Sequence, residues 1–522
     1  MNFKFVITQL GLLLIVIGIF LLAAGAWGLM LWKYYGIAIE QASSEALLIS
    51  GFLGIFLGLI PKLILRKPKP QLGRREAFLL VALSWIVGAG LAATPFLFWS
   101  LLSDVQTPAQ NAFSNSINCY FEAMSGLTTT GATILPHIDD IPHSLLLWRA
   151  TTHWLGGLGI IVLFVAVLPT LGAGGKKLFQ VESPGPQPSG VRPQIASTAR
   201  ILWMIYLGMT VAETVALRIA GMSWFDAICH TFATLATGGF STRDASVSAF
   251  HSVSIETIII IFMILAGLNF GLYYQLIRGR FKSFFSDPEM RLYLAIVFTA
   301  CVIVILFLLE ERIVDTTGTH TEPSVGSAIR HGVFQVVSII TTTGFCTADF
   351  DQWGFFPKAI LLGIMFIGAS AGSTGGGIKV IRVLISYKVL KLEVERVFRP
   401  NVVRPLKVGD SPVSPEMRLS TLAYVIGILL FFLVGALLIM GFEVNNPILS
   451  HNGTMIDFTT AASASAATLN NIGPGLALVG AVKNYAWFTN ESKIVMTVLM
   501  AVGRLEIFAI LVLFVPRFWR QY

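Results

Sequence analysis

Charged side chains are scarce in this sequence, since Asp, Glu, Lys and Arg make up only 12% of its 522 residues. A soluble globular chain carries roughly 25%, whereas this chain is 55% hydrophobic and has a mean hydropathy of +0.76. The composition excludes an ordinary soluble protein and indicates an integral membrane protein. A net charge of +8 could suggest nucleic acid as a partner. Basic residues also gather on the cytoplasmic side of membrane proteins, so we expect a lipid bilayer and no nucleic acid.

Cysteine is rare as well, and the sequence motifs of soluble enzymes are missing. The four cysteines form no C-x-x-C pair and lie in apolar or re-entrant segments, so we expect buried small residues and no disulfide framework. No H-E-x-x-H, G-x-S-x-G or Walker A pattern occurs. We therefore expect no enzymatic activity and no organic cofactor in this chain.

Ten apolar runs are long enough to cross a bilayer, which takes about 18 or more residues. They are 5–32, 45–65, 76–102, 143–170, 198–220, 253–277, 289–311, 357–390 (interrupted), 418–441 and 493–515. The first run is too long for a signal peptide and is interpreted as a retained span. Basic clusters follow alternate spans, at 62–75, 176–200, 278–291, 388–418 and 517–520. All of them fall on one side of the membrane if the N-terminus is cytoplasmic.

Between spans on the opposite side, four shorter apolar segments end in similar polar turns. The turns read GLTTTGATIL, ATLATGGFST, SIITTTGFCT and SAATLNNIGPG, and their matched glycines are Gly131, Gly238, Gly344 and Gly473. The flanking FEAM (121–124) and FDAI (225–228) also resemble each other. This is internal repetition. The predicted fold is an all-α membrane protein with four tandem span–pore-helix–span repeats around one central pore, preceded by two extra N-terminal spans. The predicted boundaries are 1–75 for the two spans and 76–175, 176–280, 281–392 and 393–522 for the repeats.

Polar turns at membrane depth need a reason, because each unsatisfied backbone group there costs several kcal/mol. One such turn would be interpreted as an ordinary loop, but four in a repeated unit can surround one axis. Glycine lets carbonyl oxygens point toward that axis, and a ring of carbonyls can replace the water shell of a monovalent cation. Each half-helix would add its negative carbonyl end. The predicted ion filter comprises Thr129, Thr130, Gly131, Thr237, Gly238, Thr342, Thr343, Gly344, Asn471, Ile472 and Gly473.

The interrupted span contains GASAGSTGGG at 368–377, and five of these ten residues are glycine. Each glycine costs a helix about 1 kcal/mol, so we expect the helix to break. Close helix packing would need only a glycine at every fourth position. A phosphate-binding loop would need a lysine where Ile378 stands. A non-helical loop beneath the filter fits better.

Arg504 lies inside the last span, where a cation is costly and suggests function. Glu506 is two residues further on and cannot share its helix face, so the alternative is an ion pair with an acid elsewhere in the bundle. His153, His230 and Glu213 also lie in or beside spans. We interpret them as structural, with a proton relay as the alternative.

Over nearly its whole length the chain resembles the Trk/Ktr/HKT superfamily of potassium transporters, and within it the bacterial TrkH type. The matches are SGLTTTGAT at 125–133, FATLATGGFSTRDAS at 232–246, TTTGFC at 341–346, GASAGSTGGGIKVIR at 368–382, NNIGPG at 470–475 and GRLEIF at 503–508. The resemblance implies one filter strand from each repeat, with glycines that favour potassium. Some plant relatives have a serine in the first strand and pass mainly sodium, whereas this chain has Gly131. The fourth strand, TLNNIGPG, departs from the TTTG pattern.

The resemblance also implies that the glycine-rich loop is a gate and that Arg504 sets an electrostatic barrier in the pore. The predicted gate residues are Gly368, Gly372, Ser373, Thr374, Gly375, Gly376, Gly377, Lys379 and Arg504. It further implies a homodimer in the bacterial inner membrane. A cytosolic TrkA-type regulatory subunit that binds ATP/ADP or NAD(H) would dock on 388–418 and 171–197.

Potassium uptake is the predicted function, with the potassium ion as cargo. Two alternatives stay open: a sodium-permeable transporter of the same fold, and the ion-conducting subunit of an ATP-driven potassium pump, which would need a separate ATPase chain. A membrane enzyme is a more distant alternative. A gated channel and a proton- or sodium-coupled symporter would use the same filter.

Overall fold

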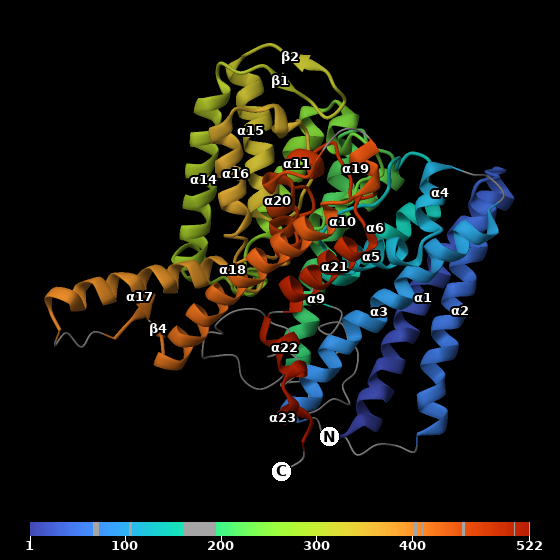
Figure 1. The fold of residues 1–522 in the computed structure, drawn as a ribbon, viewed down its shortest axis with the longest axis horizontal. Coiled ribbons are helices and arrows are strands. Elements are labelled where there is room, and N and C mark those ends of the chain that lie inside the picture. Colours follow the sequence, from blue (N-terminus) through green and yellow to red (C-terminus); the bar gives the residue numbers. More distant parts are fainter. Residues whose placement is uncertain are drawn as a thin grey trace.

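The computed structural model describes residues 1–65, 73–103, 107–157, 159, 195–400, 405–409, 411–451, 455–505 and 507–520. Helices dominate it, as Figure 1 shows. Within the described residues the only sheets are two short antiparallel hairpins. One pairs β1 (Ile313–Val314) with β2 (His320–Thr321), and the other pairs β3 (Lys407–Val408) with β4 (Ser411–Pro412). The all-α prediction is confirmed.

Two N-terminal helices, α1 (Phe3–Tyr35) and α2 (Glu40–Ile64), form a hairpin beside α3 (Arg74–Leu102), on the right of Figure 1. Helix α1 ends where Gly36 takes a left-handed φ of 70°, which glycine adopts without strain. The two helix backbones approach closely. A Cβ at Gly11 would lie 2.6 Å from the carbonyl oxygen of Gly58, so the small residues of this pair allow packing that a larger side chain would prevent.

The four repeats follow in chain order. The first contains α3, α4 (Pro108–Phe113), the half-helix α5 (Ser116–Leu127) and α6 (His143–Gly157). The second contains α9 (Ile195–Ile219), the half-helix α10 (Trp224–Leu235), α11 (Val253–Ala266), α12 (Phe270–Ile277) and α13 (Phe281–Phe285). The third contains α14 (Pro288–Leu308), the half-helix α15 (Val325–Ile340), α16 (Phe355–Met365) and α17 (Val380–Phe398). The fourth contains α18 (Pro415–Glu443), α19 (Pro447–His451), the half-helix α20 (Phe458–Leu469), α21 (Asn490–Leu505), α22 (Ile507–Leu511) and α23 (Pro516–Trp519). The predicted domain boundaries stay a prediction.

All four half-helices begin at a side-chain cap. The capping oxygens accept backbone N–H groups of the first turn and belong to Asn115, Ser223, Ser324 and Asp457. Such caps satisfy donors that a helix start otherwise leaves unpaired, and each is worth about 1 kcal/mol. The four repeats therefore share a side-chain cap at the start of each half-helix as well as a glycine turn at its end.

The predicted spans correspond to helices, with two differences. Six helices among the described residues are long and apolar enough to cross a membrane unbroken, and two further spans are bent pairs. The span predicted at 253–277 is not one straight helix, because α11 and α12 meet at 92°. The last span also bends, by 115° between α21 and α22. Of the span predicted at 143–170, residues 158 and 160–170 lie outside the described residues.

The predicted break in the 357–390 span is confirmed. Helix α16 ends at Met365 and α17 begins at Val380, which leaves residues 366–379, here called the glycine-rich loop, without a regular helix. Figure 1 shows α17 running almost at right angles to the upright α16. The loop thus lies at the corner between two helices of different direction.

Candidate functional site

Each half-helix ends in the same backbone turn. The residue two positions beyond the helix has a left-handed φ in every repeat: Thr129 (54°), Thr237 (54°), Thr342 (60°) and Asn471 (55°). Two residues later comes a glycine of positive φ: Gly131 (79°), Gly239 (78°), Gly344 (82°) and Gly473 (96°). The N–H of Thr130 donates to the Ser125 oxygen at 2.9 Å, and the equivalent bonds of the other turns measure 2.8, 2.9 and 2.9 Å. This is a Schellman cap, repeated four times.

Three of these left-handed positions hold threonine, where such caps ordinarily hold glycine. A β-branched residue at positive φ is a genuine outlier, and such strain costs of the order of 1–3 kcal/mol per residue. Strain of this kind persists only where the surrounding structure enforces it, and it clusters at functional sites. The repeated turn is therefore a candidate site in its own right.

The second turn corrects the sequence alignment. Gly239, and not Gly238, takes the place of Gly131, because Gly239 has the positive φ and follows Thr237 by two residues. The predicted matching of Gly238 with Gly131 is wrong, since the sequence offers two adjacent glycines and only the backbone distinguishes them. The similarity of FEAM and FDAI is likewise one helical turn out of register. Both half-helices have 12 residues, which aligns Glu122 with His230.

The four turns close into a ring, here called the glycine ring. A Cβ added to any of these glycines would lie against a backbone carbonyl oxygen of the next turn. That oxygen belongs to the residue immediately before the glycine of that turn. These pairs are Gly131 with Gly238, Gly239 with Thr343, Gly344 with Ile472, and Gly473 with Thr130. The contacts run from the first turn to the fourth and back to the first. Only glycine fits at these positions, both because of φ and because of the neighbouring backbone.

A cavity of about 130 Å³ opens on one side of the glycine ring. All four ring glycines line it, and so do Arg149, Asp244 and Tyr485. Buried oxygens with no hydrogen-bond partner among the described residues lie in the turns themselves: Thr129 Oγ1, Asn470 Oδ1 and Asn471 Oδ1. Orphaned buried acceptors are rare and suit a site that binds a cation. A glycine ring of this kind beside a cavity is a candidate site for a small desolvated cation.

The glycine-rich loop packs against the ends of the third and fourth half-helices. The N–H of Gly376 donates to Thr342 Oγ1 at 2.7 Å, and a Cβ at Gly376 would lie 2.5 Å from the Asn470 oxygen. A Cβ at Gly375 would lie 3.0 Å from the Thr341 oxygen. The sequence reasoning placed this loop beneath the turns, and the structure brings its residues Gly375 and Gly376 into contact with them.

The bend between α11 and α12 also contacts this loop, which explains why the bend is stable. The N–H of Ser370 donates to the Gly267 oxygen at 3.0 Å, and the N–H of Phe270 donates to the Gly372 oxygen at 3.0 Å. Asn269 caps α12 by accepting the Gly271 N–H at 2.8 Å. A break in a membrane helix frees backbone groups, and here the loop provides partners for them.

Arg504 joins the glycine-rich loop to the first repeat. Its guanidinium donates to the Thr374 oxygen at 2.7 Å and to the Gly156 and Gly157 oxygens at 2.6 Å each. Lys379, the other predicted basic residue, donates to the Gly375 oxygen at 2.5 Å. Both cations thus contact backbone carbonyls of the loop. Glu506, the acid close to Arg504 in sequence, lies outside the described residues.

Glu289 is a loop contact that the sequence reasoning missed. This buried carboxylate near the start of α14 accepts the Ala371 N–H at 2.6 Å and the Ile381 N–H at 3.1 Å, both on Oε1. One oxygen therefore joins the loop to the first turn of α17. An acid in the first turn of a helix is common, so the sequence carried no signal beyond its place at the edge of a span.

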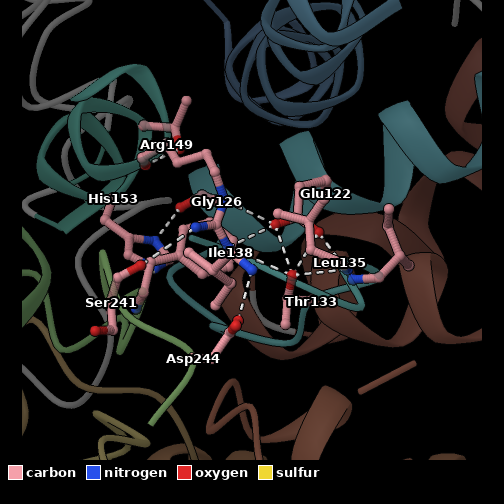
Figure 2. A network of polar contacts seen from close by, with 12 residues as sticks. Glu122, Gly126, Thr133, Leu135, Ile138, Arg149, His153, Ser241 and Asp244 are labelled. Carbon is pink, nitrogen blue, oxygen red and sulfur yellow. Dashed lines mark hydrogen bonds and ion pairs between the residues drawn. The ribbon is translucent and has the colours of Figure 1, made fainter. Parts of the chain in front are cut away.

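Figure 2 shows a polar network in which the pair of Glu122 with Arg149 was missed from the sequence, whereas His153 was predicted there as a structural residue. Arg149 on α6 pairs with Glu122 on α5 at 2.8 Å, and both side chains are buried. His153 lies one turn further along α6, where its Nε2 accepts the Phe240 N–H at 3.2 Å and its Nδ1 donates to the Gly126 oxygen at 2.7 Å. A buried arginine within a predicted span was a usable signal, by the reasoning applied to Arg504.

The remaining predicted structural residues are buried. His230 Nδ1 lies 2.8 Å from the Asp226 oxygen, and Nε2 lies 3.1 Å from Ser241 Oγ. Glu213 is fully buried in α9. The four cysteines are buried and free.

Comparison with known proteins relates this geometry to a family. The family model described as "TrkH: Cation transport protein" matches residues 43–521. The Trk system potassium uptake protein TrkH of Escherichia coli (strain K12) is 39% identical over 523 residues, which cover 100% of both chains. The Trk system potassium uptake protein TrkG of the same strain is 33% identical and covers 87% of this chain and 88% of its own. The crystal structure of the potassium transporter TrkH from Vibrio parahaemolyticus superposes with a TM-score of 0.81 at 35% identity, covering 100% of both chains.

Proposed function

The chain belongs to the TrkH family of cation transport proteins, and from that premise we propose that it takes up potassium ions across the bacterial inner membrane. The observation that carries the proposal is the closed glycine ring, with a lined cavity on one side and the glycine-rich loop against the half-helix ends. The transported potassium ion is cargo. Catalysis has no part in the proposal.

The filter would work through backbone carbonyls. A potassium ion entering the ring exchanges its water shell for carbonyl oxygens of the four turns, and the half-helix ends add partial negative charge. The proposed filter residues are those predicted from the sequence, with Gly239 added. Relatives that pass mainly sodium have a serine in the first filter strand, where this chain has Gly131. We therefore propose that potassium is the preferred ion.

The glycine-rich loop would be the gate. Its residues contact the turns at Thr342 and Asn470, and Arg504 holds it through the Thr374 oxygen. A guanidinium is always charged, so its position near the ion path adds an electrostatic barrier to cations. Displacement of the loop and of this charge would open the pathway.

Regulation would come from a second protein. The relatives are named as components of a Trk system, and we propose a cytosolic TrkA-type subunit that binds ATP/ADP or NAD(H), with this chain as a homodimer. Exposed basic side chains of the proposed docking segment 388–418 are Lys391 and Arg396 on α17 and Arg399 at its C-terminal cap. With the docking segments on the cytoplasmic side, the N-terminus would also lie in the cytoplasm. Most of the second docking segment, 171–194, lies outside the described residues.

Uptake into liposomes tests the filter with a matched pair of glycines. Gly239→Ala and Gly36→Ala both place alanine at a positive φ, which costs about 1–2 kcal/mol. Only the Cβ at Gly239 would lie against another strand, while nothing lies within 4 Å at Gly36. We expect Gly239→Ala to abolish selective rubidium uptake and Gly36→Ala to preserve it. Equal uptake by both variants would show that the ring is not the filter.

A further inference from the structure

The ion pair between Glu122 and Arg149 (Figure 2) is buried, and Arg149 lines the same cavity as the four glycines of the ring. Nε and a terminal nitrogen of the guanidinium donate to the same carboxylate oxygen, Glu122 Oε1, at 2.9 and 2.8 Å. Both side chains are at most 1% exposed. A pair this deeply desolvated is costly to break, because removal of one partner leaves the other charge buried.

Glu122 contacts the chain just beyond the first ring glycine. Its Oε2 accepts the backbone N–H of Ile134 at 3.0 Å, and its Oε1 accepts the Thr133 hydroxyl at 3.0 Å. The carboxylate therefore fixes the segment that leaves the first turn.

Arg149 reaches the same segment of the second turn. Its guanidinium donates to the Ser241 oxygen at 3.4 Å and lies 4.0 Å from the centre of the Phe240 ring. The Phe240 ring also stacks on His153 at 4.1 Å. The pair thus connects the outgoing segments of two neighbouring turns through one carboxylate and one guanidinium.

The corresponding place in the fourth repeat is apolar. Both α5 and α20 are 12-residue half-helices, so Ala464 takes the position of Glu122. Gly156 and Gly503 each face the last carbonyl of their half-helix, which aligns Met496 with Arg149. Ala464 and Met496 are both fully buried. The charged connection therefore distinguishes the first quadrant of the ring from the fourth.

We propose that the Glu122–Arg149 pair determines cation specificity by fixing the spacing between the first and second turns. This inference rests on the proposed function and deepens it. Binding groups must be held to within about 0.5 Å by their supporting residues, and a ring that relaxes by more than this can close on a smaller ion such as sodium. Glu122 and Arg149 are positioning residues, since they act through the carbonyls of the turns.

The pair has a second, separable effect through its charge. Arg149 lines the cavity beside the ring, and its charge is balanced by Glu122. Glu122→Gln leaves a cation at the cavity and should weaken cation entry, whereas Arg149→Gln leaves an anion and should favour it. The double variant is neutral again but lacks the charged connection. Apparent affinity and selectivity should therefore respond differently across the three variants.

The experiment measures rubidium and sodium uptake into liposomes by the full chain. We expect each single variant and the double variant to lose about tenfold in the rubidium-to-sodium ratio, as for the loss of one charged hydrogen bond. The KM for rubidium should rise in Glu122→Gln, fall in Arg149→Gln and return toward the original value in the double variant. The control is Glu256 with Arg330, a pair at 2.6 Å in which Glu256 is buried and Arg330 is partly exposed, and which does not line the cavity. Neutralising the control pair should change neither the rubidium-to-sodium ratio nor the KM for rubidium.

Selectivity that stays unchanged in folded variants would overturn the proposal, even if KM shifts. If the neutral variants fail to fold, Arg149→Lys keeps the charge but loses the two-nitrogen contact, and it should show an intermediate ion ratio at an unchanged KM. A ratio equal to that of the unmodified chain in Arg149→Lys would also overturn it. Gly239→Ala separates the two levels of inference. If Gly239→Ala stays selective, the ring is not the filter. If Gly239→Ala loses selectivity while the variants of the pair keep it, only the role of the pair is refuted.

Discussion

Gly473 in the last turn lies against the carbonyl oxygen of Thr130 in the first, so that a Cβ on Gly473 would stand 2.7 Å from that oxygen. Asn471 strengthens the same junction by donating to Thr130 Oγ1 at 2.9 Å. The first and fourth repeats are far apart in sequence, and this contact completes the ring. Every turn therefore has a neighbour on both sides, and a change at one glycine is felt by the adjacent strand.

Gly131→Ser should raise sodium uptake relative to rubidium. The new Cβ would lie against the Gly238 oxygen, and φ at this position is 79°, so the local carbonyls must shift. The ratio of the two fluxes in liposomes measures the effect. Gly36→Ser, which has a similar φ and no neighbour within 4 Å, is the control. An unaltered ratio in Gly131→Ser would place Gly131 outside the filter.

Arg504→Ala should speed potassium flux. The variant removes a charge near the ion path and three hydrogen bonds to carbonyls, one of them from the glycine-rich loop. A net barrier of about 1–2 kcal/mol corresponds to about 5- to 30-fold in rate. Arg504→Lys keeps the charge but cannot reproduce the planar set of bonds, so an intermediate flux is expected. Slower flux through folded Arg504→Ala protein would contradict the barrier.

Glu289→Gln should loosen the glycine-rich loop. A neutral amide oxygen accepts the two N–H groups more weakly than a carboxylate does, so unregulated flux should rise. Glu416→Gln is the matched control, because Glu416 also follows a proline in the first turn of a span but is exposed. Hydrogen exchange of residues 366–379 measures the loosening directly. Equal exchange in both variants would count against this role of Glu289.

Asp351 should make stability depend on pH between its unfolded pKa of 3.8 and its folded pKa of about 6. Burial raises the pKa of this carboxyl to about 6, and its Oδ1 accepts the Ala477 N–H between the third and fourth repeats. Because the folded pKa exceeds the unfolded value of 3.8, the folded state binds the proton more tightly. This contribution to stability is present at low pH and is lost as pH rises through about 6. Melting temperatures at pH 5 and 8 should differ less in Asp351→Asn, and an identical difference would refute the assignment.

Nucleotide should act only through the proposed cytosolic subunit. The chain has no phosphate-cradling sequence motif, so adding that subunit to liposomes should make flux depend on ATP, ADP or NAD(H). Titration of the purified membrane chain with labelled nucleotide is the control. Micromolar binding by this chain alone would contradict the division of roles.

The four turns and the broken helix could be predicted because glycine and threonine are conspicuous in apolar surroundings. Gly239 was missed because an adjacent glycine matched equally well, and only the backbone φ separates the two. The bend at Gly267 was missed, although Gly267, Asn269 and Gly271 interrupt the apolar run at this point. Its stability depends on hydrogen bonds to a loop about a hundred residues later, and no local pattern reports such contacts.

The Glu122–Arg149 pair shows a different limit. Each residue was visible in the sequence, but a charge in an apolar run identifies a costly residue and not its partner. The pairing follows from the packing of α5 against α6. The proposed role in spacing the turns follows because Phe240, just after the second turn, lies against Arg149. Sequence reasoning could have marked both residues as candidates but could not have joined them.

If the glycine-rich loop is the gate, as proposed, its hydrogen bonds to the α11–α12 bend make opening a hydration step. The Gly267 oxygen and the Phe270 N–H have their partners in the loop, at Ser370 and Gly372. When the loop moves aside, these groups lose their partners at membrane depth, and only water entering the pore can replace them. In such a gate water must arrive as the loop leaves, so the open pathway would hold more water than the closed one. Solutes too large to enter the pore should then favour the closed state osmotically.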